Sequence, residues 1–374
     1  MSIPFNRPPI TGHEIERMQD CIARGKTSGN GYYTAYCQQW LAEKLDVQAA
    51  LLTTSGSAAL DMAALLCGIR PGDEVIIPAF TFTSTANAFA LRGAKIVFAD
   101  VLPTTPVIDA DAIAALISPR TKVIVVVHYA GIAPDMEAIG ALARDNNIVV
   151  IEDAAMSFGA KYKGRYLGSF GRMGILSFHE TKVLACGEGG ALLLSDAADT
   201  AAAEIIWEKG TNRAAFARGE TQKYEWVGLG SSFLLSDIQA AWLSAQLDHH
   251  QAILKERMDL WNTYHNTLHN LAEKGHFLLP QILPFCDHNA SVFYIKCKSG
   301  EERNALLHYL QDKGILAVFH YQPLHTSPYF SPLHDGRKLV HVEDWSRTIL
   351  RLPLYYGLSN QEVEFICDSI LAFY

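Results

Sequence analysis

Short apolar segments alternate with longer amphipathic segments from residue 49 to residue 207. The apolar segments are rich in Val, Ile and Leu, and their length is typical of buried strands. The pattern predicts strands over residues 50–53, 74–77, 95–98, 122–127, 148–153, 174–178 and 191–195. It predicts helices over residues 57–66, 84–92, 109–117, 136–145 and 197–207. Because such strands must be covered on both faces, this order of elements indicates an α/β fold with a mainly parallel sheet.

The patterns before and after this region differ. The sequence from Thr11 to Glu14 matches a capping box and predicts a helix that ends near Gly25, with Ile10 and Ile15 placed to pack across its start.

A long helical pattern runs from Leu235 toward Leu271. The pattern beyond it predicts strands over residues 291–296 and 317–319 and helices over residues 302–313 and from residue 361 onward. We therefore expect a large domain over residues 1–240 and a small C-terminal α+β domain over residues 241–374.

Two polar segments are predicted to be loops. Residues 26–33 are rich in Gly, Ser and Asn, and they can be a simple connector or a loop over a ligand. Residues 208–226 are too long and irregular for a simple connector. A loop of that kind usually binds a ligand or packs on a partner subunit.

Polar residues and glycines follow several of the predicted strands. Ligands in parallel α/β folds bind at the carboxyl ends of the strands, so one pocket could collect these residues. Residues 54–58, Thr-Ser-Gly-Ser-Ala, open a helix whose free N–H groups and dipole suit an anion, although an ordinary helix N-cap uses the same residues. Phe82 could stack on a planar cofactor, but an aromatic residue there is more often part of the core.

Lys182 and Asp153 are the candidate catalytic residues. A lysine is usually a solvated surface charge. However, Lys182 closely follows a predicted strand and precedes a glycine-rich segment, residues 187–190, and Asp153 ends a buried strand. An amine that can form a Schiff base and a carboxylate that can hold a ring nitrogen protonated are the groups that pyridoxal phosphate (PLP) requires of a protein.

Composition narrows the function classes. The 374 residues include 31 Lys and Arg and 39 Asp and Glu, a net charge of −8, without a basic run, so a nucleic-acid partner is not expected. The seven cysteines form no C-x-x-C pair and are interpreted as reduced core thiols of a cytoplasmic protein. No apolar run reaches the roughly 18 residues of a membrane span.

Neither a metal site nor a nucleotide-binding motif is predicted. His265 and His269 have helical spacing but lack the acid of an H-E-x-x-H motif, and we expect them to be partly exposed. The sequence has no G-x-G-x-x-G after the first strand and no P-loop motif.

The chain resembles the sugar aminotransferases of the DegT/DnrJ/EryC1/StrS family over nearly its whole length. The motifs that carry the resemblance occur in order at residues 28–31, 71–78, 80–82, 127–131, 152–155, 177–182, 187–190, 236–241 and 320–325. The resemblance implies fold type I of the PLP-dependent transferases, which is like aspartate aminotransferase. That fold has a large domain with a mainly parallel seven-stranded sheet and a smaller C-terminal α+β domain. Further details resemble the branch that makes dTDP-4-amino-4,6-dideoxygalactose for enterobacterial common antigen, at residues 3–6, 178–182, 208–213, 230–233 and 318–321.

The resemblance also implies a role for individual residues. Lys182 would form the Schiff base with PLP and later move the proton, and Asp153 would pair with the pyridine nitrogen. The other implied cofactor-binding residues are Gly56, Ser57 and Ser177 at the phosphate, Phe82 on the ring, and Ser232. The implied substrate-binding residues are Asn30, Tyr32, Arg213, His320 and Tyr321. Family members are homodimers in which both subunits build each active site, so residues 208–226 would face the partner.

The implied reaction moves the amino group of L-glutamate to the 4-keto carbon of dTDP-4-dehydro-6-deoxyglucose, giving dTDP-4-amino-4,6-dideoxygalactose and 2-oxoglutarate. Relatives that remove a sugar hydroxyl carry histidine at the position of Lys182, which therefore favours transamination. One alternative is an aminotransferase for a 3-keto or differently configured nucleotide sugar. Another is a PLP-binding regulator or inactive scaffold. Met156, where family members usually have glutamine, favours that last alternative, whereas the pair of Asp153 and Lys182 opposes it.

Overall fold

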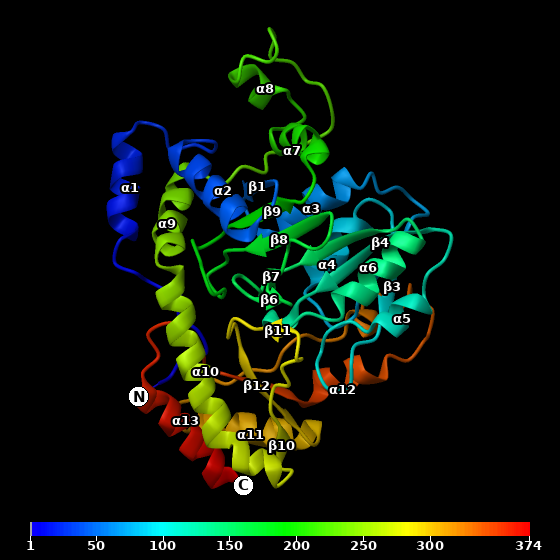
Figure 1. The fold of residues 1–374 in the computed structure, drawn as a ribbon. Helices are drawn as coiled ribbons and strands as arrows, with labels where there is room; N and C mark the ends of the chain where they lie inside the picture. The colour runs from blue at the N-terminus through cyan, green and yellow to red at the C-terminus, as the bar shows by residue number, and fades with distance from the viewer. Residues whose placement is uncertain (1) are drawn as a thin grey trace.

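A seven-stranded sheet forms the centre of the computed structural model, which describes residues 2–374 (Figure 1). In spatial order its strands are β1 (Ala49–Thr53), β9 (Gly190–Leu194), β8 (Met173–Ser177), β5 (Val149–Asp153), β4 (Thr121–Val127), β2 (Glu74–Pro78) and β3 (Lys95–Ala99). Only β9 is antiparallel to its neighbours, and the other pairs are parallel. The predicted α/β class is confirmed, and each predicted strand ends within one residue of the observed one.

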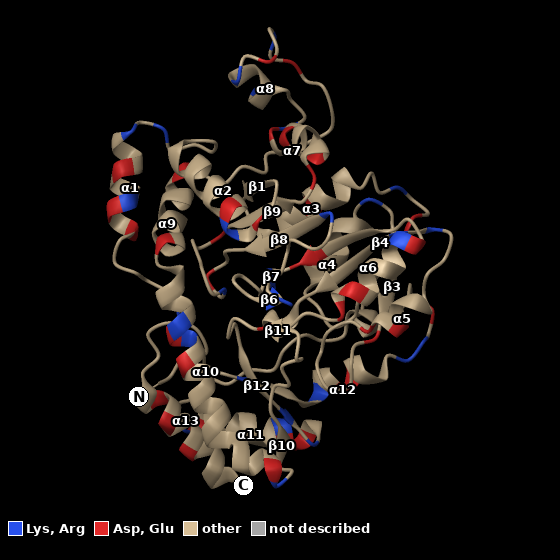
Figure 2. Cartoon of the chain, viewed as in Figure 1, with Lys and Arg blue, Asp and Glu red and all other residues tan. Residues whose placement is uncertain are grey.

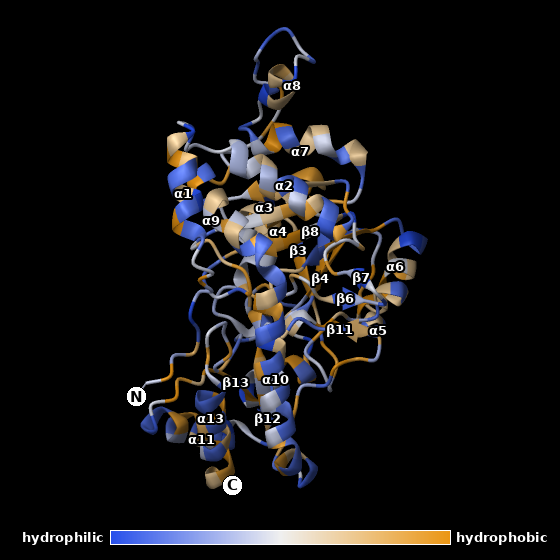
Figure 3. Cartoon of the chain, turned by 60° about the vertical axis from the view of Figure 1, so that its left-hand side comes forward, coloured by the Kyte–Doolittle hydropathy of each residue, from blue (hydrophilic) through white to orange (hydrophobic). Residues whose placement is uncertain are grey.

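Both faces of the sheet are buried, as the apolar strands require. Along β9, Leu192 and Leu194 join one core with the helix α3 (Gly56–Leu66), whereas Ala191 and Leu193 join another with α2 (Tyr32–Leu45) and α9 (Asp237–Asp248). Figure 3 shows the apolar colour concentrated in the central strands and the polar colour on outer helix faces. The remaining helices between strands are α4 (Thr83–Ala90), α5 (Ala110–Ala114), α6 (Met136–Asp145), the 3₁₀ helix η2 (Ala197–Asp199) and α7 (Thr200–Trp207).

The helix α2 was not predicted from the sequence. Its N-cap is Gly31, which offers no side chain, and the loop predicted over residues 26–33 overlaps the first two residues of the helix. The free N–H groups of Tyr33 and Thr34 instead donate to the buried carboxylate of Asp237, at 3.2 and 2.7 Å. The start of this helix is therefore stabilised by a residue about 200 positions away, which local pattern does not reveal.

The capping box at the first helix is only half formed. The carboxylate of Glu14 accepts the backbone N–H of Thr11 at 2.7 Å, but α1 (Glu14–Ala23) begins after His13, which gives no side-chain cap. Ile10 and Ile15 are 55% and 60% exposed. The prediction that they pack across the helix start is therefore wrong. The helix begins at Glu14, later than the capping box at Thr11 predicts.

A smaller α+β unit follows the long helix α10 (His250–Glu273), at the lower end in Figure 1. Its sheet has the order β10 (Phe277–Leu278), β12 (Phe293–Cys297) and β13 (Ile349–Leu352), and its helices include α11 (Gly300–Asp312) and α13 (Asn360–Phe373). The strand predicted over residues 317–319 is wrong. Val318 makes only an isolated bridge with Arg351, and β13 is the third strand instead.

Several elements cross between these units. Ala241, Leu243 and Leu247 of α9 pack in a core with β1 and β9, whereas Trp345 of α12 (Val340–Thr348) packs in the main core. Ile3 packs in the core of the smaller unit. The domain boundary between residues 240 and 241 stays a prediction.

Three small strands and several short helices complete the described chain. A second three-stranded sheet joins β11 (Cys286–Asp287), β6 (Lys161–Tyr162) and β7 (Arg165–Tyr166). The short helices are η1 (Tyr129–Gly131), α8 (Arg213–Ala217) and η3 (Leu324–Thr326). All seven cysteines are buried and unpaired within residues 2–374. No helix in this range is long and apolar enough to span a bilayer. Basic and acidic residues are interspersed over the molecule in Figure 2.

Glu152 anchors the chain that follows β5 to the sheet. Its fully buried carboxylate accepts the backbone N–H groups of Gly168, Phe170 and Gly171 at 2.5–2.8 Å. It also pairs with Nε2 of His128 at 2.7 Å. Burial alone would raise the pKa of Glu152, but the hydrogen bonds from His128 and the backbone lower it on balance.

Glu152→Gln should lower the free energy of unfolding by about 3 kcal/mol, because an amide leaves buried donors without an acceptor. Glu16→Gln, whose side chain is 80% exposed, is the matched control. Urea unfolding followed by circular dichroism measures both. The lowered folded-state pKa means that the stabilisation is lost at acid pH, so the difference should shrink below about pH 4. Equal midpoints for the two variants at pH 7 would contradict this role.

Candidate functional site

A cavity of about 690 Å³ lies at the carboxyl ends of the parallel strands. Residues after β1, β2, β4, β5 and β8 line it, together with residues of the smaller unit and with Phe5 and Asn6 near the start of the chain. The lining residues that the sequence singled out are Gly56, Ser57, Phe82, Asp153, Met156, Ser177, Lys182, His320 and Tyr321. The prediction that one pocket collects the strand ends is confirmed.

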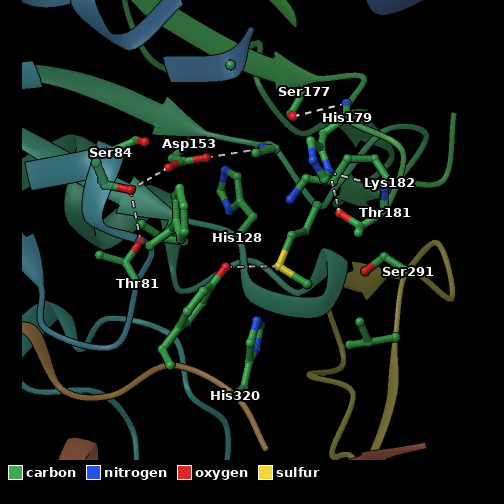
Figure 4. A pocket seen from close by; sticks show the side chains of 18 of the residues that line it. Thr81, Ser84, His128, Asp153, Ser177, His179, Thr181, Lys182, Ser291 and His320 are labelled. Carbon is green, nitrogen blue, oxygen red and sulfur yellow. Dashed lines mark hydrogen bonds between the residues drawn. The ribbon is translucent and has the colours of Figure 1, made fainter. Parts of the chain in front are cut away.

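Asp153 is fixed at the last position of β5 and is only 7% exposed. Its Oδ2 accepts the hydroxyl of Thr85 at 2.8 Å, and its Oδ1 accepts the N–H of Ala155 at 3.2 Å. The hydroxyls of Thr85 and Thr81 are 2.9 Å apart. These hydrogen bonds hold the carboxylate facing the cavity (Figure 4).

Lys182 lies in a loop that closes on itself after β8. The N–H of Phe178 donates to the carbonyl of Gly189, and the N–H of Cys186 donates to the carbonyl of Phe178, at 2.8 and 2.9 Å. The glycine at 190 is required, because a Cβ there would lie 2.4 Å from the backbone carbon of Ser55. These contacts hold the backbone of the loop in place and so fix the position from which the side chain of Lys182 enters the cavity.

The cavity lowers the pKa of Lys182. Burial is the main cause, the nearby charge of Asp153 opposes it, and the charge of Arg351 adds to it. The amine is thus neutral at a lower pH than an ordinary surface lysine. A neutral amine is the form that acts as a nucleophile and as a base.

The start of α3 provides an anion site next to Lys182. Ser55 caps the helix through the N–H of Ala58, at 3.1 Å, as the N-cap interpretation predicted. The hydroxyl of Ser57 bonds that of Ser84 at 2.6 Å, and both serines line the cavity. Ser177 is so close to Gly56 that a Cβ on the glycine would lie 3.0 Å from its Cβ. Hydroxyls and the helix dipole together suit a phosphate.

Aromatic rings form the opposite wall. Phe82 is 57% exposed and lines the cavity, so it is not part of the core. The rings of His320 and Tyr321 stack with centroids 3.7 Å apart, and Nδ1 of His320 lies 2.6 Å from the hydroxyl of Tyr129. Burial, with added effects of Arg351 and Lys182, holds the pKa of His320 well below its usual value. His320 is therefore neutral at physiological pH.

Met156 also lines the cavity. Its sulfur accepts the hydroxyl of Tyr321 at 3.8 Å (Figure 4), a weak contact that leaves the hydroxyl available for a stronger acceptor.

Four predicted site residues do not line this cavity. Asn30, Arg213 and Ser232 instead surround Glu208, a carboxylate that is 1% exposed. Asn30 donates to its Oε1 at 3.1 Å, Arg213 lies 3.7 Å from its Oε2, and Ser232 pairs with it through a β-bridge. Tyr32 is exposed, and the guanidinium of Arg24 lies 3.8 Å from its ring centroid. The roles of these four residues stay predictions.

His128 and Arg351 are two of the cavity residues that were assigned no role from the sequence. His128 is fully buried, and its Nδ1 has no hydrogen-bond partner among residues 2–374. Arg351 enters from β13. The signal that could have revealed it is a lone charge between the apolar residues Leu350 and Leu352, in a strand that was not predicted.

Comparison with known proteins identifies the family. A family model described as DegT/DnrJ/EryC1/StrS aminotransferase matches residues 8–371. The chain belongs to this aminotransferase family.

Individual relatives agree with the family assignment. GDP-perosamine synthase of Escherichia coli O157:H7 is 32% identical over 372 residues, which cover 100% of this chain and 98% of that protein. The aminotransferase TlmJ from Streptoalloteichus hindustanus has a TM-score of 0.91 and 28% identity, covering 99% of this chain and 98% of its own. Spr1654 from Streptococcus pneumoniae, in a PMP form, has a TM-score of 0.90 and 25% identity, with 98% of both chains covered. The same protein in a PLP form has a TM-score of 0.89 and 25% identity, covering 99% of this chain and 97% of its own.

This member of the family is a PLP-dependent sugar aminotransferase of fold type I. The cavity fits the cofactor on its own chemistry. It combines an amine whose pKa is lowered, a buried carboxylate with two fixed donors, and hydroxyls at a helix N-terminus. These are the groups that an aldehyde, a ring nitrogen and a phosphate require.

Lys182→Ala should abolish the visible absorbance band of covalently held PLP and lower turnover at least about 10³-fold, because the amine that is predicted to attach PLP and to move the proton is lost. The protein should still fold. Asp153, the carboxylate nearest in charge to this amine, keeps its hydrogen bonds from Thr85 and Ala155 in the variant. Lys255→Ala, at a lysine that is 78% exposed, is the control. The spectrum of the reconstituted protein and its thermal midpoint measure both effects. Full activity of the Lys182 variant would contradict the assignment.

Proposed function

We propose that the protein transfers the amino group of L-glutamate to the 4-keto carbon of dTDP-4-dehydro-6-deoxyglucose, giving dTDP-4-amino-4,6-dideoxygalactose and 2-oxoglutarate. The observation that carries the amino transfer is the meeting of Lys182 and Asp153 in one cavity beside the start of α3. The choice of this sugar rests on the sequence features shared with the branch that makes it, such as residues 178–182 and 208–213. The product, dTDP-4-amino-4,6-dideoxygalactose, would be used in the synthesis of enterobacterial common antigen.

Several residues of the cavity have a part in this reaction. PLP, when bound, supplies a ring that accepts electrons and carries the amino group between the two half-reactions. Asp153 holds the ring nitrogen protonated, and the hydroxyl of Thr85 keeps this carboxylate in place. Ser57 and Ser177 would hold the phosphate, and Phe82 would pack against the ring, since all three residues line the cavity.

Lys182 moves the proton. Its neutral amine takes the proton from the α-carbon of the donor, and in the second half-reaction it delivers a proton to the sugar carbon that receives the amino group. The lowered pKa of Lys182 favours the neutral form that the first step needs. His320 and Tyr321, which line the opposite wall of the cavity, would contact the sugar.

A second candidate acceptor is a GDP-linked keto sugar. The specific support is the 32% identity with GDP-perosamine synthase over 372 residues. A third candidate acceptor is the 3-keto isomer of the dTDP sugar, which differs from the proposed acceptor in the position of the keto group. Contacts that discriminate such substrates are worth about 1–3 kcal/mol each, so direct comparison is needed.

The visible spectrum of the PLP-loaded protein tests both half-reactions. L-Glutamate should remove the absorbance band, and dTDP-4-dehydro-6-deoxyglucose should restore it. The matched acceptors are its 3-keto isomer and a GDP-linked 4-keto sugar at the same concentration. The proposal expects the dTDP 4-keto sugar to react at least about 10-fold faster than either, as one or two lost pocket contacts would give. Faster recovery with another acceptor would overturn the substrate assignment while amino transfer stands.

We also propose that the protein is a homodimer with shared active sites. The segment after α7 extends from the end of the molecule opposite the smaller unit (Figure 1). It exposes large apolar side chains, with Tyr224 at 55%, Trp226 at 78% and Leu229 at 76%. Such a patch is typical of a protein interface. In a dimer, Ser232 and Arg213 would serve the partner's cavity, which explains why they do not line their own.

Replacing both Trp226 and Leu229 by Asp should convert a dimer into a monomer, because two charges would be buried in the contact. Sedimentation velocity measures the mass of each variant. Leu278→Asp, at a leucine 57% exposed in the smaller unit, is the control and should remain dimeric. A wild-type protein that sediments as a monomer at micromolar concentration would contradict the proposal.

A further inference from the structure

The N-terminal segment, residues 3–9, connects the smaller unit with the wall of the cavity. At its start, Ile3 is 3% exposed and packs in the core of the smaller unit. The N–H of Ile3 donates to the carbonyl of Gly314 at 2.8 Å, and the N–H of Leu316 donates to the carbonyl of Ile3 at 3.0 Å. The N-terminal segment is therefore fixed to the smaller unit before it reaches the cavity.

Phe5 and Asn6 of the N-terminal segment line the cavity. The ring of Phe5 lies over the guanidinium of Arg351, with 4.7 Å from Cζ to the ring centroid. The side-chain amide of Asn6 donates to the backbone carbonyl of Glu180 at 3.1 Å. Glu180 belongs to residues 178–189, here called the lysine loop, and precedes Lys182 by two positions. The N-terminal segment thus contacts the lysine loop just before Lys182.

A second connection holds the lysine loop just after Lys182. Gln246 of α9 is fully buried, and its Oε1 accepts the N–H of Ala185 at 2.9 Å. Its Nε2 donates to the carbonyl of Pro9, at the other end of the N-terminal segment, at 2.5 Å. Lys182 therefore lies between two backbone positions, Glu180 and Ala185, and each is linked to the N-terminal segment by one side-chain amide.

The lysine loop has little regular structure of its own. It forms no helix or strand. The N–H of Lys182 donates to the carbonyl of His179, and the N–H of Glu180 donates to the carbonyl of Gly187, both at 2.9 Å, so these internal bonds are local. An irregular segment keeps one position through its bonds to the structure around it. The two amides, of Asn6 and Gln246, supply such bonds on either side of the lysine.

We propose that Asn6 is a positioning residue for Lys182. Its hydrogen bond to Glu180, anchored in the smaller unit through Ile3, sets the place of the Lys182 amine relative to the carbon atoms between which it moves the proton. Proton transfer requires near hydrogen-bond distance, and a displacement of about 1 Å can slow a reaction about 10²-fold. The inference rests on the role that the proposed function gives to Lys182, and it is independent of the identity of the sugar.

Asn6→Leu tests the position of the amine by kinetics. Leucine keeps a side chain of similar size and removes the donor. In the PLP-loaded protein, saturating L-glutamate should remove the visible band about 3- to 10-fold more slowly than in the wild type, as expected for one lost hydrogen bond. The concentration of L-glutamate that gives half the maximal rate should stay within about twofold, because Asn6 acts through Lys182 and not on the donor. Asn6→Gln keeps the amide and should restore part of the rate.

The matched control is Asn146→Leu. Asn146 is exposed and lies outside the cavity lining, and its side-chain amide also donates to a backbone carbonyl, that of Leu142, at 2.9 Å. This variant should react like the wild type. The thermal midpoints of Asn6→Leu and Asn146→Leu should agree within about 2 °C, since each loses one partly exposed hydrogen bond.

Hydrogen exchange followed by mass spectrometry measures the lysine loop without any substrate. In PLP-loaded Asn6→Leu, peptides from residues 178–189 should exchange at least about threefold faster than in the wild type, because a bond that holds the loop is lost. Peptides from α6 should exchange at the wild-type rate. Asn146→Leu should leave the exchange of the lysine loop unchanged.

Each result decides for or against the inference. An unchanged maximal rate overturns it, even if the lysine loop exchanges faster, because the bond would then hold the loop without placing the amine. A slower rate with unchanged exchange, or a changed half-saturating concentration alone, would assign Asn6 to direct contact with the donor and also overturn it.

The proposed function can fail separately. If the wild type does not react with L-glutamate, the proposed donor is wrong, and the inference is judged on the visible band that forms when PLP is added to the apoprotein. At saturating PLP, Asn6→Leu should form this band about 3- to 10-fold more slowly, because the same amine must reach the cofactor aldehyde. Equal rates of band formation would overturn the inference.

Discussion

The pleat of β5 sends two adjacent carboxylates in opposite directions, and the site depends on this division. Glu152 turns into the protein and accepts three backbone N–H groups and the ring of His128, so it fixes the chain that returns from β5 to β8. Asp153 turns toward the cavity, where Thr85 and Ala155 hold it. Because successive side chains of a strand alternate between faces, anchoring the first carboxylate also orients the second. The anchoring of the following chain and the position of the cavity carboxylate are thus both set by one short strand.

The cavity combines contributions from both units of the chain. The large sheet supplies the amine, the carboxylate and the start of α3, and the smaller unit supplies His320, Tyr321 and Arg351. The guanidinium of Arg351 places a positive charge in the cavity, and the carboxylates that line it are the buried Asp153 and the exposed Glu188. A site of this kind attracts anionic ligands, and each substrate of an aminotransferase that uses an amino acid and a nucleotide sugar is an anion.

The sequence predicted the parallel sheet closely, because each strand is a continuous apolar run between helices and needs no information from distant residues. It also placed Lys182, Asp153, Gly56 and Ser57 at the strand ends that meet. It failed where partners are remote. The helix α2 takes its cap from Asp237, and β13 was overlooked because Arg351 interrupts its apolar pattern. Asn30, Tyr32, Arg213 and Ser232 could be assigned only by resemblance, since none of them lines the cavity of its own chain.

The order in which the chain is synthesised determines when its N-terminal elements, β1 and α2, can fold. Within the seven-stranded sheet of residues 2–374, the neighbour of β1 is β9, so Ala49–Thr53 cannot join the sheet until residue 194 has been made, and α2 has no cap until Asp237 follows. Meanwhile β2, β3, β4 and β5 can already pair among themselves. During synthesis roughly the first 50 residues therefore remain unpaired with the sheet, and their apolar side chains are exposed to other nascent chains. The slowest stage of folding should be the late pairing of β9 with β1 and the capping of α2 by Asp237, because these contacts join residues far apart in the sequence.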